Sequence, residues 1–186
     1  PQYFYVAESG WVSGQSKAPD HHAFVPENGA GDVALAQGAD SVRVPFLWQG
    51  PDGVSIRRTY TFKRASYEVE VRDEVVNAGT GTWQGTVYRQ LLRAPPEVKS
   101  GMTNPESFSF SGATWWDGGY QRRKFNEDYL EDGRVDAQVK GGWIAILQHH
   151  FFTAWIPHAD DTTTISLDNP NGGARALIRE MGPGVN

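Results

Sequence analysis

Two pairs of adjacent histidines, His21-His22 and His149-His150, come closest to the residue types of a metal site. Imidazole nitrogens bind zinc, and a carboxylate from Asp160 or Asp161 would complete such a site. Adjacent residues in a strand point to opposite faces, so neither pair can bind one ion with both rings from a strand. Nothing else in the sequence requires the pairs to meet. We therefore expect histidines that only form hydrogen bonds, with no metal and no cofactor.

Patterns for covalent or acid–base catalysis are equally weak. The chain has no cysteine, which excludes thiol nucleophiles, thiolate metal sites and disulfides. It has no Gly-x-Ser-x-Gly elbow. Carboxylate pairs such as Asp160-Asp161 or Asp128 with Glu131 lie in polar segments, whereas catalytic carboxylates usually need a partly apolar pocket. These observations predict that the chain is not an enzyme.

Aromatic residues are a richer signal, with seven Trp, seven Tyr and nine Phe. Trp143 and Trp155 flank the most apolar stretch, and we expect both in the core. Trp115-Trp116 would face opposite ways in a strand, so one could be core and the other exposed. The alternative is an internal strand with both faces covered. We predict a protein-contact surface in segment 108–120, formed by Phe108, Phe110, Trp115, Trp116 and Tyr120.

Charge and hydropathy exclude two further classes. The net charge is -5, and the basic run Arg122-Arg123-Lys124 is followed by acidic residues within 127–132, as on an ordinary solvated surface. A nucleic-acid partner would need a dense basic patch. The longest apolar candidate, 143–157, is too short for a bilayer and is interrupted by polar residues. No signal peptide is visible, and the opening residues suggest a piece of a longer protein.

Period-2 alternation dominates the chain and predicts antiparallel strands at 41–48, 54–63 and 66–77. Turns are expected at 49–53 and 77–81, which contain Gly with Pro, Asp or Asn. Further strands are predicted at 82–93, 107–116, 134–140, 143–148, 152–157, 162–168 and 174–180.

Helical periodicity is nearly absent, apart from one or two turns around 126–131. Segment 13–40 is read as mostly loop with one short strand. With no defensible linker, residues 1–186 are expected to form a single all-β domain, a twisted β-sandwich.

Two stretches carry a family resemblance. Residues 140–148, Lys-Gly-Gly-Trp-Ile-Ala-Ile-Leu-Gln, are followed at 151–158 by Phe-Phe-Thr-Ala-Trp-Ile-Pro-His. Residues 59–64, Thr-Tyr-Thr-Phe-Lys-Arg, precede Tyr-Glu-Val-Glu-Val and an Asn-Ala-Gly turn. Both stretches resemble the periplasmic domain of the YidC family of Gram-negative bacteria, as does the opening of the chain. Ala65 and Ser66 depart from the Gly and Asp that the family often has.

This resemblance implies a β-supersandwich related in outline to sugar mutarotases. It also implies a larger protein, with a transmembrane anchor before this domain, a five-helix insertase core after it, and domain residues beyond both ends of this sequence. The implied function is to assist insertion and folding of inner-membrane proteins at the periplasmic face of the inner membrane. The implied partners are Sec translocon accessory subunits, nascent inner-membrane proteins and the rest of the same polypeptide.

Two rival functions remain open at this point. A carbohydrate-binding or mutarotase-like β-sandwich would bring a histidine and a carboxylate together on a concave face. A passive spacer would show neither a pocket nor a sizeable exposed apolar patch.

Overall fold

The computed structural model describes residues 4–14, 16–29, 31–94, 109–125, 129, 135–148, 150–169 and 176–185. The chain divides into two compact units. Unit 1 comprises residues 1–10 and 86–184, and unit 2 comprises residues 11–85 with the last two residues. Each unit is described by itself below.

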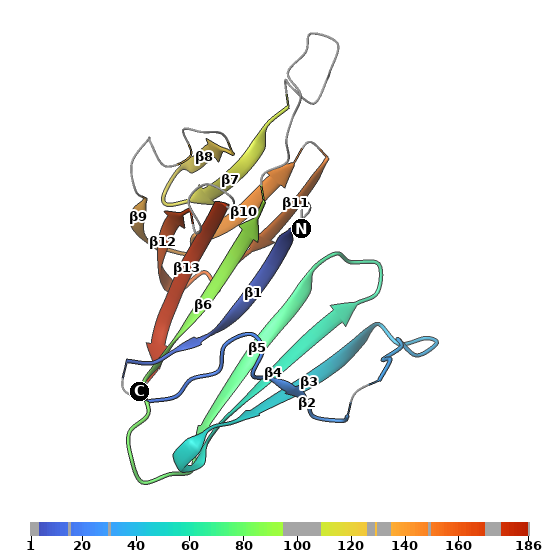
Figure 1. Cartoon of the computed structure of the whole chain (residues 1–186). Helices are drawn as coiled ribbons and strands as arrows, with labels where there is room; N and C mark the ends of the chain where they lie inside the picture. The colour runs from blue at the N-terminus through green and yellow to red at the C-terminus, as the bar shows by residue number, and fades with distance from the viewer. Residues whose placement is uncertain are drawn as a thin grey trace. The chain divides into compact units, whose positions relative to one another are not determined.

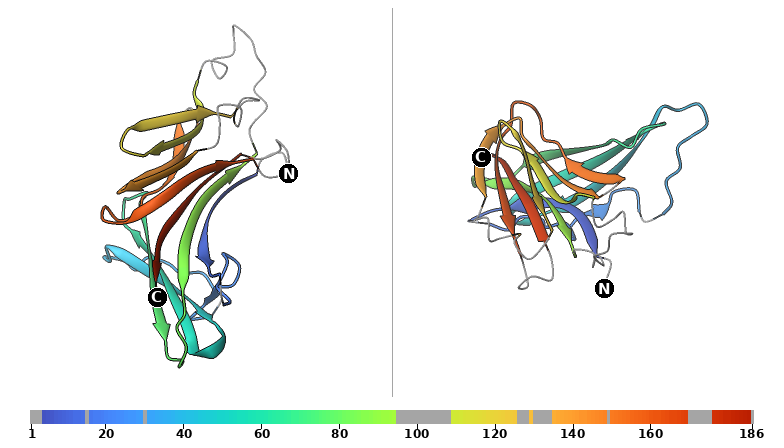
Figure 2. Two further views of the ribbon diagram at one scale, coloured as in Figure 1. Left: turned by 90° about the vertical axis from the view of Figure 1, so that its left-hand side faces the viewer. Right: turned by 90° about the horizontal axis from the view of Figure 1, so that it is seen from above.

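Unit 1 contains two antiparallel sheets, visible as separate layers of strands (Figures 1 and 2). The five-stranded sheet has the order β1-β6-β13-β12-β9. Its strands are β1 (Tyr5–Val12), β6 (Gly85–Arg93), β13 (Ala176–Val185), β12 (Thr162–Asp168) and β9 (Asp136–Lys140). The four-stranded sheet has the order β11-β10-β7-β8. Its strands are β11 (Phe151–Trp155), β10 (Trp143–Gln148), β7 (Ser111–Trp116) and β8 (Tyr120–Lys124).

The hydrophobic core of unit 1 draws on both sheets. Ile144 and Ile146 of β10 are fully buried, and so are Ile165 of β12 and Ile178 of β13. Residues two apart on a strand share a face, so one side of each sheet supplies this core. The cluster consists of Leu91, Ala113, Trp115, Tyr129, Ile144, Ile146, Ile165, Leu167 and Ile178. Trp155 packs against it from β11.

A buried ion pair lies at one end of the apolar side of the five-stranded sheet. Glu180 is fully buried on β13, and its Oε1 accepts a 2.6 Å hydrogen bond from Arg89 of β6. The other oxygen, Oε2, is buried without a hydrogen-bond partner. Burial raises the pKa of the Glu180 carboxyl, and the charge of Arg89 opposes that rise only in part.

Unit 2 is built on a four-stranded antiparallel sheet of order β2-β3-β4-β5. Its strands are β2 (Val25–Pro26), β3 (Ser41–Gln49), β4 (Val54–Lys63) and β5 (Val69–Asn77). A 3₁₀ turn, η1 (Pro51–Gly53), joins β3 to β4. Gly53 has a positive φ of 81° and lies so close to the backbone of Gly79 that a Cβ would stand 2.9 Å from its nitrogen, which explains the glycine.

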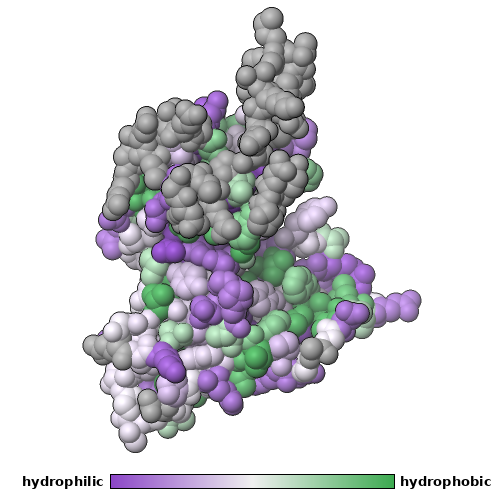
Figure 3. All heavy atoms as spheres, viewed as in Figure 1, coloured by the Kyte–Doolittle hydropathy of each residue, from purple (hydrophilic) through white to green (hydrophobic). Residues whose placement is uncertain are grey.

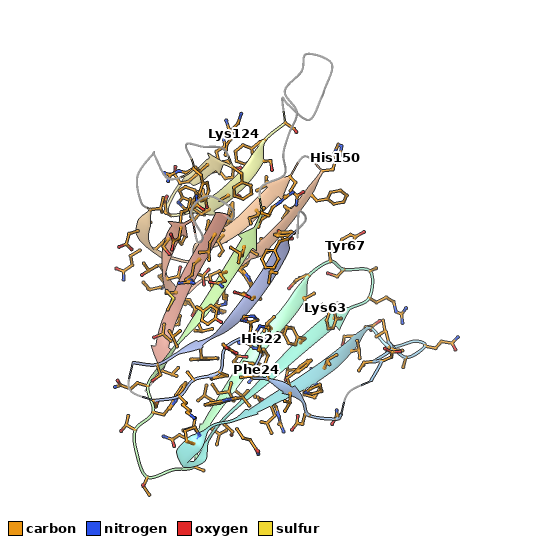
Figure 4. All side chains as sticks on the ribbon, in the orientation of Figure 1. His22, Phe24, Lys63, Tyr67, Lys124 and His150 are labelled. Carbon is orange, nitrogen blue, oxygen red and sulfur yellow. The ribbon has the colours of Figure 1, made fainter. Side chains whose placement is uncertain are left out.

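One side of this sheet carries a second buried ion pair. Arg58, only 2% exposed, donates from Nε and Nη2 to the two oxygens of Asp73, at 2.7 and 2.6 Å. Trp11 Nε1 also donates to Asp73, at 2.7 Å. Phe24 lies against the guanidinium, 4.4 Å from Arg58 Cζ to the ring centroid (Figure 4). Every oxygen of this carboxylate therefore has a partner.

The predicted all-β class is confirmed, and most predicted strands lie within two or three residues of the observed ones. Segment 13–40 contains one short strand, β2, as expected. Two strands, β1 and β8, were not among those predicted. The helical turn expected at 126–131 lies outside the described residues, apart from Tyr129. Among the described residues no helix is long and apolar enough to cross a bilayer.

Candidate protein-contact surface

The two adjacent tryptophans of β7 point to opposite sides of the four-stranded sheet. Trp115 is 4% exposed in the core cluster, and its Nε1 donates to Asp117 at 3.0 Å. Trp116 is 39% exposed on the other side, which we call the outer face. Of the alternatives open from the sequence, the structure therefore has one buried and one exposed tryptophan. We leave Trp115 out of the candidate surface because it belongs to the core.

A row of aromatic residues crosses the outer face. Trp116 is the cross-strand partner of Tyr120 on β8 and of Trp143 on β10, so all three side chains leave the sheet on the same side. The Tyr120 and Trp143 rings have centroids 6.1 Å apart, and Tyr120 is 53% exposed. Trp143 is half-buried in this row rather than in the core cluster, unlike the expectation from its apolar neighbours.

Phe110, which directly precedes β7, extends this surface. The Arg122 guanidinium carbon lies 5.4 Å from the centroid of the Phe110 ring, within the range of a cation–π contact. Gly112 makes the arrangement possible, because a Cβ there would stand 2.8 Å from the Phe110 ring and 2.1 Å from the Arg123 carbonyl oxygen. Phe108 lies outside the described residues.

The basic run of β8 is partly structural. Arg122 and Lys124 are exposed, whereas Arg123 is half-buried with its guanidinium 6.0 Å from the Trp115 ring. Arg123 also donates to the Tyr129 carbonyl at 3.4 Å. Tyr129 is buried, donates its hydroxyl to the Leu177 carbonyl, and has its pKa raised by that burial. Only two of the three cations therefore face solvent beside the aromatic row.

The residues considered for metal or acid–base chemistry do not form a shared site among the described residues. The rings of His21 and His22, tilted against each other with centroids 3.8 Å apart, belong to unit 2, whereas His150 lies in the β10–β11 turn of unit 1. His149 is outside the described residues. Asp160 forms an ion pair with Lys140 at 3.0 Å. Within the part of the chain that the structure describes, no three His, Asp or Glu side chains converge.

One histidine and one carboxylate do approach each other, on the loop before β12. His158 Nδ1 lies 3.9 Å from Asp160 Oδ2, but the two side chains are 75% and 77% exposed. Solvent surrounds both groups, and a base and an acid that act on a sugar ring would need the walls of a cleft. This geometry does not favour the carbohydrate alternative.

Comparison with known proteins places the chain in a family. A family model described as the YidC periplasmic domain matches residues 1–183. The chain belongs to the YidC periplasmic domain family. It is 46% identical over 185 residues to the membrane protein insertase YidC of Xanthomonas euvesicatoria, which covers 98% of this chain and 32% of that protein.

Further insertases named YidC give the same picture. The protein of Xanthomonas oryzae is 47% identical over 181 residues, covering 96% of this chain and 31% of the relative. That of Xylella fastidiosa is 46% identical over 188 residues, covering 98% and 33%. The chain thus spans about a third of the length of the YidC proteins it matches. The recognised resemblance is confirmed.

The sequence did not reveal that Trp143 belongs to the outer face of this YidC-family domain. Its apolar neighbours Ile144 and Ile146 suggested burial. In the strand these two point to the side opposite Trp143, whereas Ala145 and Leu147 share the side of Trp143. Because residues 143–147 are all apolar, the sequence held no local signal that separated the two sides of this strand.

Proposed function

We propose that this chain is the periplasmic domain of a membrane protein insertase and that it works by contacting other proteins, without catalysis. The observation that carries the proposal is the aromatic row formed by the exposed Trp116 and Tyr120 and the half-buried Trp143 within a domain of the YidC family. The domain lies on the periplasmic side of the inner membrane, where such proteins are inserted and fold. Both units belong to one such domain, since the family match runs through both.

The chemistry of the row suits a protein partner. Tyrosine and tryptophan offer large rigid surfaces at a small cost in side-chain entropy, and they are enriched at the centres of protein interfaces. Arg122 and Lys124 border the row on β8, so a partner with acidic residues at its rim would be attracted to this face. The partners we propose are Sec translocon accessory subunits and nascent inner-membrane proteins.

Exposed apolar side chains also occur in unit 2. Figure 3 shows hydrophobic residues on the viewed face of unit 2, over its sheet. Several exposed apolar side chains belong to that sheet, including Phe62 and Val69, each 43% exposed. These two are a cross-strand pair next to the β4–β5 turn, and on the same side Phe46 and Tyr60 pack edge to face with ring centroids 5.6 Å apart. Those two rings are half-buried, whereas Trp116 and Tyr120 are exposed, so the outer face of unit 1 is the stronger candidate.

A photo-crosslinking experiment in the full-length protein tests the proposal. A benzophenone amino acid replaces Tyr120, and in a matched control it replaces Tyr67, an exposed tyrosine of unit 2. We expect crosslinks to Sec accessory subunits or nascent chains from position 120, with at most a tenth of that yield from position 67. Equal yields from the two positions, or none from 120 while the protein inserts its substrates, would remove the basis for this surface.

A further inference from the structure

The edge strands of the three sheets differ in how they are protected against pairing with another chain. Exposed edges usually carry charges or proline, which discourage strand addition. Among the described edge strands, β1 has Glu8, β2 is two residues long with Pro26, and β5, β8 and β9 each carry at least two charged residues. β11 has the sequence Phe-Phe-Thr-Ala-Trp, with no charge and no proline.

β11 and the residue that follows it carry the most exposed apolar side chains among the described residues of unit 1. Phe151 is 76% exposed, Phe152 is 73% exposed, and Ile156 just after the strand is 75% exposed. Phe152 leaves the sheet on the outer face, since its cross-strand partner Leu147 pairs in turn with Gly112. Phe151 leaves on the opposite side. Apolar groups therefore stand on both sides of the same edge.

An open pocket of about 240 Å³ adjoins the start of β11. Phe110, Leu147 and Phe152 are among its lining residues, and none of the lining residues is Asp, Glu, Lys or Arg. His150, which Figure 4 shows at the turn that leads into β11, is also among the lining residues. An apolar side chain of a bound segment would fit here, whereas a charged one would lose its hydration without gaining an opposite charge.

The backbone of β11 specifies the shape of what binds. β11 pairs with β10 through Ile144–Gln148 on one side, and no hydrogen bond between described residues joins its backbone to another strand on the other side. Alternate N–H and C=O groups of an antiparallel edge strand point outward at regular spacing. Only an extended backbone matches that spacing, which is the basis of recognition by strand addition.

We propose that the free edge of β11 binds an extended, uncharged polypeptide segment as an additional strand, with one of its apolar side chains in the pocket beside Phe110 and Phe152. Recognition would come from the backbone and a single pocket, so it would tolerate many sequences. This proposal goes beyond the contact surface proposed above, because it uses the edge of β11 and not the aromatic row, and of the residues placed on that surface it uses only Phe110.

Binding is tested on the 186-residue chain with a capped seven-residue peptide of alternating threonine and valine. Two N-methylated forms serve as matched probes. One form is methylated at alternate residues, so one edge of the extended peptide keeps its donors and can pair with β11. The other form is methylated at every residue, so neither edge has donors. We expect the first form to bind at least tenfold more tightly than the second, measured by calorimetry or fluorescence anisotropy.

Phe152→Lys supplies the charge that β11 lacks, and Val76→Lys places the same charge on the exposed edge strand β5 as a control. Both side chains are more than half exposed, so neither change should unfold the chain. We expect F152K to weaken binding of the better peptide at least tenfold and V76K to leave it within twofold. Tyr120→Ala should also leave binding unchanged, which separates this proposal from the proposed function.

Four results would overturn the proposal. Equal affinity for both N-methylated forms would show that the backbone edge is not recognised. Equal binding by F152K and V76K would place the peptide elsewhere. Dimers of the unliganded chain in sedimentation, converted to monomers by F152K, would assign the edge to a second copy. Protection of β11 amides from hydrogen exchange in the full-length protein without peptide would assign it to another segment of the same polypeptide.

Discussion

Unit 1 and unit 2 bury the inner sides of their sheets in different ways. Unit 1 encloses an apolar core with contributions from two sheets, as Ile146 on β10 and Ile178 on β13 illustrate. Within the described residues unit 2 has one sheet, and its buried side combines Ile56 with the Arg58–Asp73 ion pair. In the described part of unit 2, which has no second sheet, the Arg58–Asp73 pair and the rings of Trp11 and Phe24 beside it cover part of the buried side.

The ion pairs of the two units differ in how completely they are satisfied. Burial would lower the pKa of the Arg58 guanidinium, but the hydrogen bonds and charge of Asp73 outweigh it and raise that pKa. In unit 1 burial dominates at Glu180, whose Oε2 has no partner, and raises the pKa of the carboxyl. The surroundings of the Arg58–Asp73 pair thus stabilise its charged form. The surroundings of Glu180 disfavour the charge of its carboxylate, although Arg89 lies beside it.

Breaking the satisfied pair should have the largest effect. Asp73→Asn removes the negative charge beside Arg58, and we expect a loss of about 3–5 kcal/mol in the free energy of unfolding, as for other buried pairs that lose one partner. Urea denaturation followed by fluorescence measures it. The double variant R58M/D73N should lose less than D73N alone, because it leaves no uncompensated charge. A loss below about 1 kcal/mol for D73N would contradict the central role of this pair.

The tryptophan donor to the same carboxylate should have the next largest effect. Trp11→Phe keeps an aromatic ring beside Trp83, whose centroid lies 5.8 Å away, but removes the donor to Asp73. A hydrogen bond to a charged group contributes about 1.5–3 kcal/mol. Trp83→Phe is the matched control, since its 3.2 Å bond goes to the neutral Lys17 carbonyl. Equal losses in the two variants would show that ring packing, not the carboxylate, sets the cost.

Removing one methylene group from the apolar core of unit 1 should lower the free energy of unfolding less than either change above. Ile146→Val removes one methylene from a fully buried side chain, which typically costs about 0.5–1.5 kcal/mol. The loss should be the same at pH 5 and pH 8, because the neighbourhood is apolar. Val76→Ala, on an exposed position of β5, should change stability by less than about 0.5 kcal/mol. A pH-dependent loss for I146V would indicate coupling to the Glu180 pair.

The incompletely satisfied pair should give the smallest effect, and one that depends on pH. The folded-state pKa of Glu180 is raised above its ordinary value of 4.5, so its contribution to stability is greatest below that value and is lost as pH rises. Glu180→Gln does not titrate. Relative to E180Q, the native chain should therefore gain stability as pH falls from 8 towards 4.5, measured by thermal unfolding. A gain in the opposite direction would show that Arg89 dominates over burial.

Much of the sheet structure could be predicted because its signal is local. Strands at 143–148 and 162–168 agree with the observed β10, which is a short apolar run, and β12, whose buried residues alternate without a break. The strand predicted at 66–77 begins only at Val69, because Ala65 takes a positive φ of 54° in the preceding turn. β8 was missed because its Tyr-Gln-Arg-Arg-Lys sequence has no apolar alternation, and the cross-strand contacts that hold it come from β7.

The candidate surface was predicted only in part, since exposure is a property of packing. The opposite orientations of Trp115 and Trp116 follow from strand geometry, but which of them is buried depends on where the second sheet lies. The position of β7 inside its sheet, between β10 and β8, also could not be read from local pattern. The edges of this sheet therefore belong to β11 and β8, and β7, which carries the two tryptophans, lies between two neighbours.

The order of residues along the chain has a consequence for biosynthesis. Unit 1 is assembled from residues 1–10 and 86–184. β1 is therefore synthesised well before β6, its neighbour in the sheet. Almost all of unit 2 is complete when residue 85 has been made. At translation rates of 5–20 residues per second, the synthesis of residues 86–185 takes roughly 5–20 s. For those seconds the growing chain holds nearly all residues of unit 2, while β1 does not yet have β6 beside it.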